Sequence, residues 1–255
     1  MTDMPQRYMQ TLIDRLTKVR DTQSEAIAAA AEACAKSIIN DKLVFTFGTG
    51  HGSFAAMEMY PRTGTVTGFR PMVESSMISF HRVLGDAGAL QYRFIHGQEG
   101  YGDAIFASHQ TDPGDTMLIF SHSGLNAVTL DIAVAAQKKG MTLIGVTSVP
   151  HSSATPSRHS CGKRLYEIAD IVIDTDVPLG DAALEIAGVK GKTGATSTSI
   201  AIAIGHAINS TTAELVAAAG KDPYLMVSPN TTDKAEATMQ NDKNYAELWR
   251  RLRMR

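Results

Sequence analysis

The sequence has little of what marks a secreted, membrane-spanning or nucleic-acid-binding protein. Its 255 residues include only two cysteines, Cys34 and Cys161, which cannot make a disulfide framework. The first ten residues lack the apolar core of a secretion signal, and no apolar run is expected to approach the length needed to span a bilayer. A formal net charge of −2 provides no basic excess for nucleic acid. We therefore expect a cytoplasmic protein that binds neither nucleic acid nor membranes.

The length suits one domain over residues 1–255, in which residues 1–40 are helical, residues 41–220 form the core and residues 221–255 form a C-terminal extension. Apolar residues recur at helical spacing over 12–19 and again over 27–38, with charged residues between them. The pattern predicts two amphipathic helices that cover the core or a partner subunit.

Short and almost wholly apolar runs follow, which is typical of strands buried on both faces of a parallel sheet. The runs are Leu43–Phe47, Met117–Phe120, Leu143–Thr147 and Ile168–Ile173, with a further strand expected near Phe69–Val73. Helical patterns lie between or after them, at Phe54–Arg62, Ala127–Lys139, Lys163–Glu167 and Ser197–Ala218. The alternation of strand and helix predicts an α/β fold with a central parallel sheet.

The C-terminal segment has a different composition. Residues Pro229–Asn244 are polar and predict turns, and a short helix is expected around Tyr245–Leu252. This helix carries the single tryptophan, Trp249, and several arginines. We expect it to dock on the domain or on a neighbouring subunit.

Ligands of open parallel sheets bind beyond the carboxyl ends of the strands, so the turns after the strands are the places to search. The first turn, GTGHGS, spans Gly48–Ser53 and runs into a helix. Its glycines permit a close approach of the backbone to an anion. The turn is one residue from a dinucleotide fingerprint, and Glu74 stands about where a ribose-binding carboxylate would. A nicotinamide-dependent oxidoreductase is therefore one alternative.

A second turn, Ser121–Gly124, carries two hydroxyls and a glycine, and Asn126 follows at a helix start. A third hydroxyl cluster, Thr196–Thr198, precedes the long apolar helix, where we expect it both to cap the helix and to contact a ligand. Several hydroxyl-rich turns favour one phosphoryl group held from several sides over a dinucleotide. The candidate binding residues in these turns are Thr49, Gly50, His51, Ser53, Ser121, Ser123, Gly124, Asn126, Thr196, Ser197 and Thr198.

The turns GTGHGS and SHSGLNAV, with the segments SRHSCGKRLYEIADIVID and VPLGDAALEI, resemble the sugar isomerase (SIS) domain family, and above all its stand-alone bacterial members. The resemblance extends from about Leu12 to Asn230. It implies a flavodoxin-like αβα sandwich that is usually dimeric, with phosphate held by Ser121, Ser123, Thr198, Thr49 and Ser53. Family members often carry a hydroxyl where Gly52 stands, so Ser53 is the candidate to replace that contact.

The reaction that the resemblance implies is aldose–ketose isomerisation of a sugar phosphate through an enediol. This reaction needs a base and a group that shuttles the hydroxyl proton, and we expect no organic cofactor or metal. Similar isomerases carry a glutamate at the position of Glu58, which Arg62 could instead neutralise. Glu74 and His81 match acidic and histidine residues of the stand-alone members. The resemblance therefore implies Glu58, Glu74 and His81 as catalytic candidates, and we rank His206 on the long helix below His81.

Two other functions would use the same phosphate-binding turns. The domain also serves as the ligand-binding half of regulators, which favours a non-catalytic sensor, and lyase or etherase chemistry on an amino-sugar phosphate would reuse the same acid and base. The basic loop Ser157–Lys163 either closes over the sugar phosphate or is an ordinary surface loop. Asp181 either binds sugar hydroxyls or caps the next helix.

Overall fold

The structure is a computed structural model that describes residues 3–78, 88–230 and 233–253. Its centre is a five-stranded parallel sheet of order β2-β1-β3-β4-β5. The strands are β1 (Val44–Gly48), β2 (Phe69–Pro71), β3 (Thr116–Phe120), β4 (Thr142–Thr147) and β5 (Ile171–Asp174). All five strands expected from the apolar runs are present, and the predicted α/β class is confirmed.

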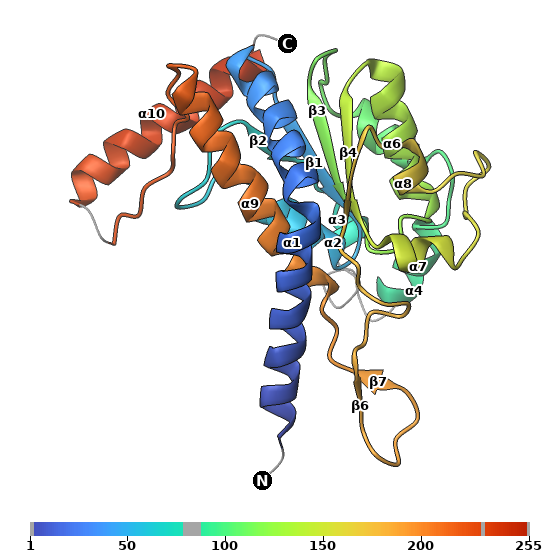
Figure 1. The fold of residues 1–255 in the computed structure, drawn as a ribbon. Helices are drawn as coiled ribbons and strands as arrows, with labels where there is room; N and C mark the ends of the chain where they lie inside the picture. The colour runs from blue at the N-terminus through green and yellow to red at the C-terminus, as the bar shows by residue number, and fades with distance from the viewer. Residues whose placement is uncertain (1–2, 79–87, 231–232, 254–255) are drawn as a thin grey trace.

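The alternation of side chains along the strands divides the core between the two faces of the sheet. On one face, Val44, Leu118 and Val146 pack against α1 (Met4–Ile39), α2 (Gly52–Glu58) and α9 (Ser197–Ala218). The other face is covered by the helices that Figure 1 draws on the opposite side of the sheet. These are α3 (Ser75–Ile78), α4 (Gly88–Ile95), α5 (Tyr101–Ala107), α6 (Ala127–Lys139), α7 (Val149–Ser153) and α8 (Leu165–Ile168).

The N-terminal region is one helix where the sequence suggested two. Helix α1 runs unbroken for 36 residues, and its C-terminal half packs along α9. The polar stretch Arg20–Glu25 between the two apolar faces was the reason to expect a break. It contains no glycine or proline that would end a helix, so the helix continues through it.

Helix α9 corrects the expectation that no segment is long and apolar enough to cross a bilayer. Of the helices that the structure describes, α9 alone meets the criteria of length and composition. Ile200, Ile204 and Ile208 on this helix are buried against α1 and the sheet. The core helix of a soluble protein meets the same criteria, so the length and composition of α9 are only weak evidence of a membrane span.

The C-terminal helix α10 (Lys234–Arg253) is much longer than predicted, and it begins inside the segment expected to form turns. Leu248 on this helix is buried in the core, and the guanidinium of Arg251, also on α10, donates to the carbonyl of Ile38 at 2.8 Å. The helix therefore docks on the domain, as one of the two predictions for the tail stated.

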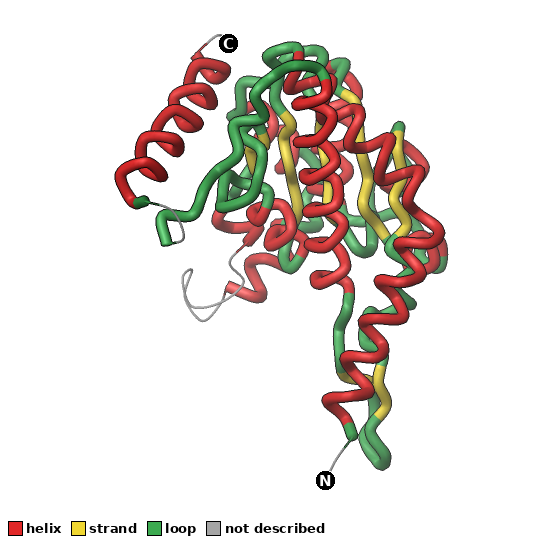
Figure 2. The backbone as a smooth tube through the Cα atoms, turned by 60° about the vertical axis from the view of Figure 1, so that its left-hand side comes forward, coloured by secondary structure: helices red, strands yellow, loops and turns green. Residues whose placement is uncertain are grey.

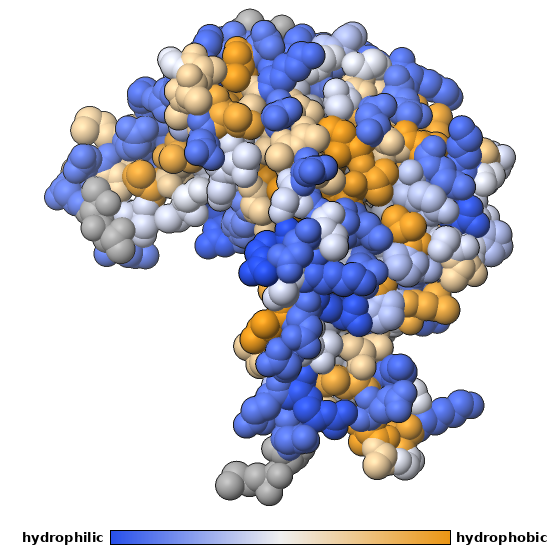
Figure 3. Space-filling view, in the orientation of Figure 1, coloured by the Kyte–Doolittle hydropathy of each residue, from blue (hydrophilic) through white to orange (hydrophobic). Residues whose placement is uncertain are grey.

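A hairpin of β6 (Leu184–Glu185) and β7 (Lys192–Thr193) projects beyond the sheet beside the N-terminal end of α1 (Figures 1 and 2). The hydroxyl of Tyr8 on α1 donates to the carbonyl of Ala195 at 2.9 Å, which joins the two elements. Figure 3 shows apolar residues over this projection, and Ile186 and Val189 are exposed there.

Candidate functional site

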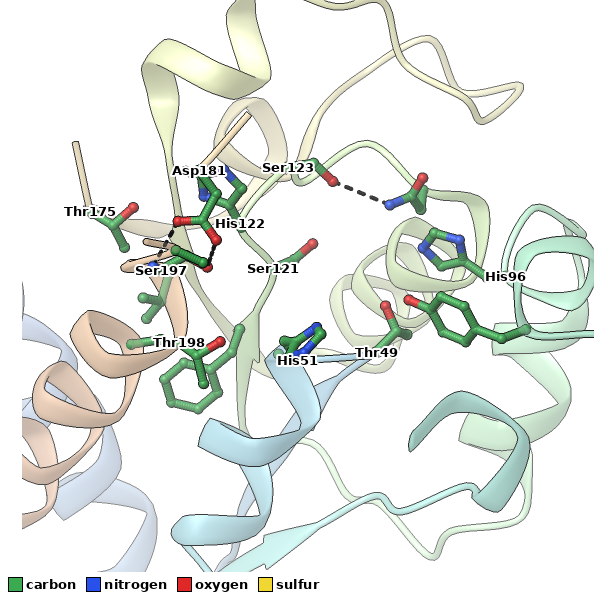
Figure 4. Close-up of a pocket in the computed structure, with 17 residues that line it drawn as sticks. Thr49, His51, His96, Ser121, His122, Ser123, Thr175, Asp181, Ser197 and Thr198 are labelled. Carbon is green, nitrogen blue, oxygen red and sulfur yellow. Dashed lines mark hydrogen bonds between the residues drawn. The ribbon is translucent and has the colours of Figure 1, made fainter. Parts of the chain in front are cut away.

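The strand order of the sheet locates the candidate site. Connections run in opposite directions from β1 and β3, and ligands of open α/β sheets bind in the crevice beyond such a switch point. A cavity of about 330 Å³ lies at this place, beyond the carboxyl ends of β1 and β3 (Figure 4). It is lined by Thr49, His51, Gly52, Tyr92, His96, Phe120, Ser121, His122, Ser123, Asn126, Val146, Thr175, Asp181, Ala195, Ser197, Thr198 and Ala201.

Two glycines let the turns after β1 and β3 approach each other closely. A Cβ on Gly52 would lie 2.4 Å from the carbonyl oxygen of Phe120, and a Cβ on Gly48 would lie 2.4 Å from the carbonyl of Gly52. A hydroxyl-bearing side chain at position 52 therefore has no room in this arrangement. The close approach of the two turns therefore requires glycine at position 52.

The two serines of the turn after β3 are arranged as donors. The hydroxyl of Ser121 accepts a hydrogen bond from the backbone N–H of Gly124, and that of Ser123 accepts from the side-chain amide of Asn126, both at 3.2 Å. Each hydroxyl retains its own proton for donation. Figure 4 shows Ser121 facing the centre of the cavity, so this turn presents O–H donors to an anion.

The N-terminus of α9 is already occupied by a carboxylate from the same chain. Asp181 accepts the backbone N–H groups of Thr196 and Ser197, both at 2.9 Å, and the hydroxyl of Ser197 at 2.7 Å. Burial opposes the charge of Asp181, but these hydrogen bonds hold the pKa of its carboxyl below the ordinary value. Of the two roles predicted for Asp181, the structure shows the capping role.

Several buried polar atoms around this end of the cavity have no hydrogen-bond partner among the described residues. They are both ring nitrogens of His122 and the hydroxyl of Thr175, which line the cavity. The His122 ring packs edge-on against His151 at 4.4 Å between centroids. Burial, together with the charge of His151, lowers the pKa of His122 to about 4. Because unpaired buried polar groups are costly, these atoms are suited to meet a polar ligand.

The opposite end of the cavity is formed by α4. Tyr92 and His96 stack with 4.9 Å between their centroids, and the hydroxyl of Thr49 bonds to that of Tyr92. Burial, with the charge of Arg158 adding to it, lowers the pKa of His96 to about 4. Both His96 and His122 are therefore neutral near pH 7.

Four residues predicted to bind the ligand do not line the cavity: Gly50, Ser53, Gly124 and Thr196. Ser53 is buried, and its hydroxyl donates back to the carbonyl of Gly50 at 2.6 Å. Gly124 adopts a φ of +60°, which closes the turn after β3. The hydroxyl of Ser53 therefore stabilises the first turn and does not replace the hydroxyl that Gly52 lacks.

The two catalytic candidates that the structure describes, Glu58 and Glu74, do not line the cavity. Glu58, at the end of α2, pairs with Arg62 and accepts from the ring of His206, 3.1 Å away on α9. Burial opposes its charge, but these two partners hold the pKa of Glu58 below the ordinary value. Glu74 accepts the backbone N–H and hydroxyl of Ser76 at 3.3 and 3.2 Å. His81 lies outside the described residues.

Among the polar lining residues, sequence reasoning missed Tyr92, His96 and Thr175, and it assigned no role to His122. Tyr92 on α4 and His96, just beyond the C-terminal end of this helix, are one turn apart in a segment for which no helix was predicted. His122 was visible as the central residue of SHSG. Within the described ranges, no group of three or more histidine, cysteine or acidic side chains could hold a metal ion.

Fold and site together define an α/β domain with a hydroxyl-rich crevice at its switch point. The family model for the SIS domain matches residues 7–148, and the chain belongs to this family. A UPF0309 protein of Halalkalibacterium halodurans is 31% identical over 91% of this chain and 92% of its own length. A UPF0309 protein of Oceanobacillus iheyensis is 32% identical over 97% and 98%.

Solved structures agree on the fold. The phosphoheptose isomerase GmhA of Neisseria gonorrhoeae matches with a TM-score of 0.53 at 15% identity, and covers 83% of this chain and 98% of its own. A phosphoheptose isomerase of Francisella tularensis matches with a TM-score of 0.50 at 17% identity, over 84% of this chain and 100% of its own. At these identities the likeness extends to the fold alone.

Proposed function

We propose that this protein binds a sugar phosphate in the crevice between β1 and β3 and isomerises it between aldose and ketose through an enediol. The observation that carries the proposal is the meeting of two hydroxyl-bearing turns, at Thr49 and at Ser121–Ser123, around one cavity with buried unpartnered polar atoms. The two phosphoheptose isomerases with this fold support the substrate class.

In this proposal the turn after β3 binds the phosphoryl group. Ser121 and Ser123 donate their remaining hydroxyl protons to its oxygens, and Thr49 contributes a hydroxyl from the turn after β1. The sugar chain extends toward Thr175 and Thr198. Neutral His122 then donates or accepts a hydrogen bond at a sugar oxygen without placing a charge beside it.

The proton must be moved by a group near the reacting carbons. His51 lines the cavity, and Figure 4 shows its ring facing the space below Ser121. We assign the acid–base role to His51. The pair Glu58–His206, between α2 and α9, is the second candidate for this role because it joins a carboxylate to an imidazole at 3.1 Å.

Exchange in deuterated water tests the proposal. The protein is incubated with pentose, hexose and heptose phosphates, and incorporation of deuterium next to the carbonyl is followed by NMR. If the protein is an isomerase with His51 as the base, exchange should occur in the wild type and be abolished in His51→Asn. Loss of exchange in Glu58→Gln instead would identify the Glu58–His206 pair as the acid–base group. His109→Asn is the matched control, since this histidine does not line the cavity. Absence of exchange for every sugar phosphate would contradict isomerisation.

One observation favours a second function, a non-catalytic sugar-phosphate-binding protein. Glu58, the second candidate for the base, is paired with Arg62 and His206, and its lowered pKa makes it a weak base, so no isomerisation follows if His51 does not move the proton. Under this alternative, sugar phosphates bind tightly and no exchange occurs.

A homo-oligomer is part of the proposal. Met9 and Ile13 on α1 and Leu179, Ile186 and Val189 near the hairpin leave apolar side chains exposed on the projection. A second copy of the chain, as the SIS resemblance implies, would cover them.

A further inference from the structure

The candidate site has a charge problem. A phosphate monoester carries a charge of about −1.5 to −2 at pH 7. Among the described residues, no lysine or arginine lines the cavity. His96 and His122 are neutral there, because burial holds their pKa values at about 4. Hydroxyl groups satisfy the oxygens of a phosphoryl group, but they do not neutralise it. A cation at the rim of the cavity would supply the charge that the lining lacks.

Arg158 is the cation that the structure brings to the rim. Its guanidinium Nη1 donates to Oδ1 of Asn126 at 3.2 Å, and Asn126 lines the cavity beside Ser123. The charge of Arg158 contributes to the lowered pKa values of His96 and His151, for which burial is the main cause. The guanidinium therefore lies close enough to the crevice for its field to act on a lining histidine.

The loop that carries Arg158, residues 157–163, is attached to the domain on both sides of the arginine. The backbone N–H of Arg158 donates to the carbonyl of Leu125 at 3.0 Å. The backbone and hydroxyl of Ser160 donate to Glu99 at 2.6 and 2.5 Å. These hydrogen bonds hold the loop against the rim of the crevice.

The strongest anchor is a buried pair next to Arg158. The ring Nε2 of His159 lies 3.0 Å from Oδ1 of Asp131, and the two side chains are only 10% and 3% exposed. Nδ1 of His159 accepts the backbone N–H of Cys161 at 3.0 Å, so Nε2 carries the proton and donates to Asp131. The second oxygen of Asp131 accepts the N–H groups of Gly100 and Gly102. This pair ties the loop to α6 and α5.

We propose that Arg158 binds the phosphoryl group of the ligand from the rim of the crevice, and that the hydrogen bond between His159 and Asp131 positions it there. The inference rests on the proposed function, because it names the charged partner of the same site. A guanidinium provides two parallel N–H donors to a phosphoryl group, which hydroxyls alone do not.

Calorimetric titration tests the proposal with named probes, namely inorganic phosphate, ribose 5-phosphate, fructose 6-phosphate and sedoheptulose 7-phosphate. For the probe that wild type binds most tightly, Arg158→Gln should weaken binding about tenfold or more, as expected for the loss of a charge-assisted hydrogen bond. Arg158→Lys should retain part of the affinity. Added salt should weaken binding to the wild type more than binding to Arg158→Gln.

Arg164→Gln is the matched control. It removes the same charge from the same segment, but Arg164 donates to the carbonyl of Thr155 and pairs with Glu167. Binding to Arg164→Gln should equal that of wild type. Equal binding by wild type and Arg158→Gln, while Ser121→Ala binds weakly, would overturn the role of Arg158 and leave the proposed function standing. Failure of wild type to bind any of the four probes would overturn both.

Two further measurements separate positioning from folding. Removal of Arg158 should raise the pKa of His96 in an NMR titration without ligand, whereas Arg164→Gln should leave it unchanged. If His159 acts by positioning Arg158, His159→Ala alone should weaken binding. The double variant His159→Ala/Arg158→Gln should then bind no more weakly than Arg158→Gln alone. An unchanged His96 pKa, or fully additive losses, would contradict the proposal.

Discussion

His96 and His122 are two residues whose environment decides their chemistry. Either side chain would ordinarily titrate near pH 6.5, but burial lowers both pKa values to about 4. Burial thus keeps two imidazoles neutral in a cavity with hydroxyl donors. Near pH 7 such rings can exchange hydrogen bonds with the hydroxyl groups of a ligand, but they do not attract an anion by charge.

The same shifts predict how stability depends on pH. The unfolded chain takes up protons on these histidines below about pH 6.5, whereas the folded chain does so only near pH 4, so stability should fall as the pH drops through that window. Each histidine contributes a slope of up to about 1.4 kcal/mol per pH unit. Urea unfolding of wild type and His122→Asn measures it, and the variant should show the shallower dependence. Parallel curves for the two proteins would show that His122 is not held neutral by the fold.

At the scale of elements, the contact between the turns after β1 and β3 constrains one position tightly. We expect Gly52→Ala to destabilise the fold by about 1–3 kcal/mol, because the new Cβ would meet the carbonyl of Phe120 at 2.4 Å. Gly97→Ala is the control, since a Cβ there would lie 3.5 Å from its nearest neighbour. Urea unfolding compares the two, and equal stabilities would mean that the turns are not in contact.

The N-terminus of α9 makes a second prediction at this scale. Asp181→Ala removes the acceptor of the backbone N–H groups of Thr196 and Ser197, and should cost about 1–2 kcal/mol. Glu185→Ala is the control, because this carboxylate is exposed on β6 and pairs only with the side chain of Lys192 on the adjacent strand. Thermal unfolding of both variants measures the difference. A similar small effect for both would argue that α9 does not depend on its cap.

Prediction from sequence succeeded where local pattern decides structure. The continuous apolar run of β4, the hydroxyl turn Ser121–Gly124 and the bounds of α6 and α9 follow from hydrophobicity and turn residues alone. Prediction from sequence failed where tertiary contacts decide whether a segment is helical. Helix α10 is polar along much of its length and is stabilised by docking, as the bond from Arg251 to Ile38 shows.

The residues of the candidate site likewise fall into those that local sequence pattern predicts and those that tertiary contacts bring together. The turns that follow the strands were predicted because topology brings the carboxyl ends of parallel strands together. Tyr92 and His96 reach the cavity through the packing of α4, which no local pattern encodes. Glu58 was expected in the pocket from its place on α2, but its partners Arg62 and His206 hold it at the α2–α9 contact.

On the scale of the whole molecule, the projection of α1 and the β6–β7 hairpin predicts assembly (Figure 1). Light scattering should find a homodimer or a higher oligomer, and Ile13→Glu with Val189→Glu should shift it toward monomer, because both side chains are exposed and apolar. Met239→Glu on α10 is the control, since Met239 is 69% exposed and away from the projection. A monomeric wild type would contradict this prediction.

The central claim is that the crevice between β1 and β3 holds the phosphoryl group of a sugar phosphate. The most direct test is calorimetric titration of the wild type, and of the double variant Ser121→Ala/Ser123→Ala, with pentose, hexose and heptose phosphates and with the same sugars without phosphate. The account predicts that at least one sugar phosphate binds to the wild type, that its unphosphorylated sugar does not, and that the double variant loses this binding. Binding that does not depend on the phosphate, or that persists unchanged in the double variant, would contradict it.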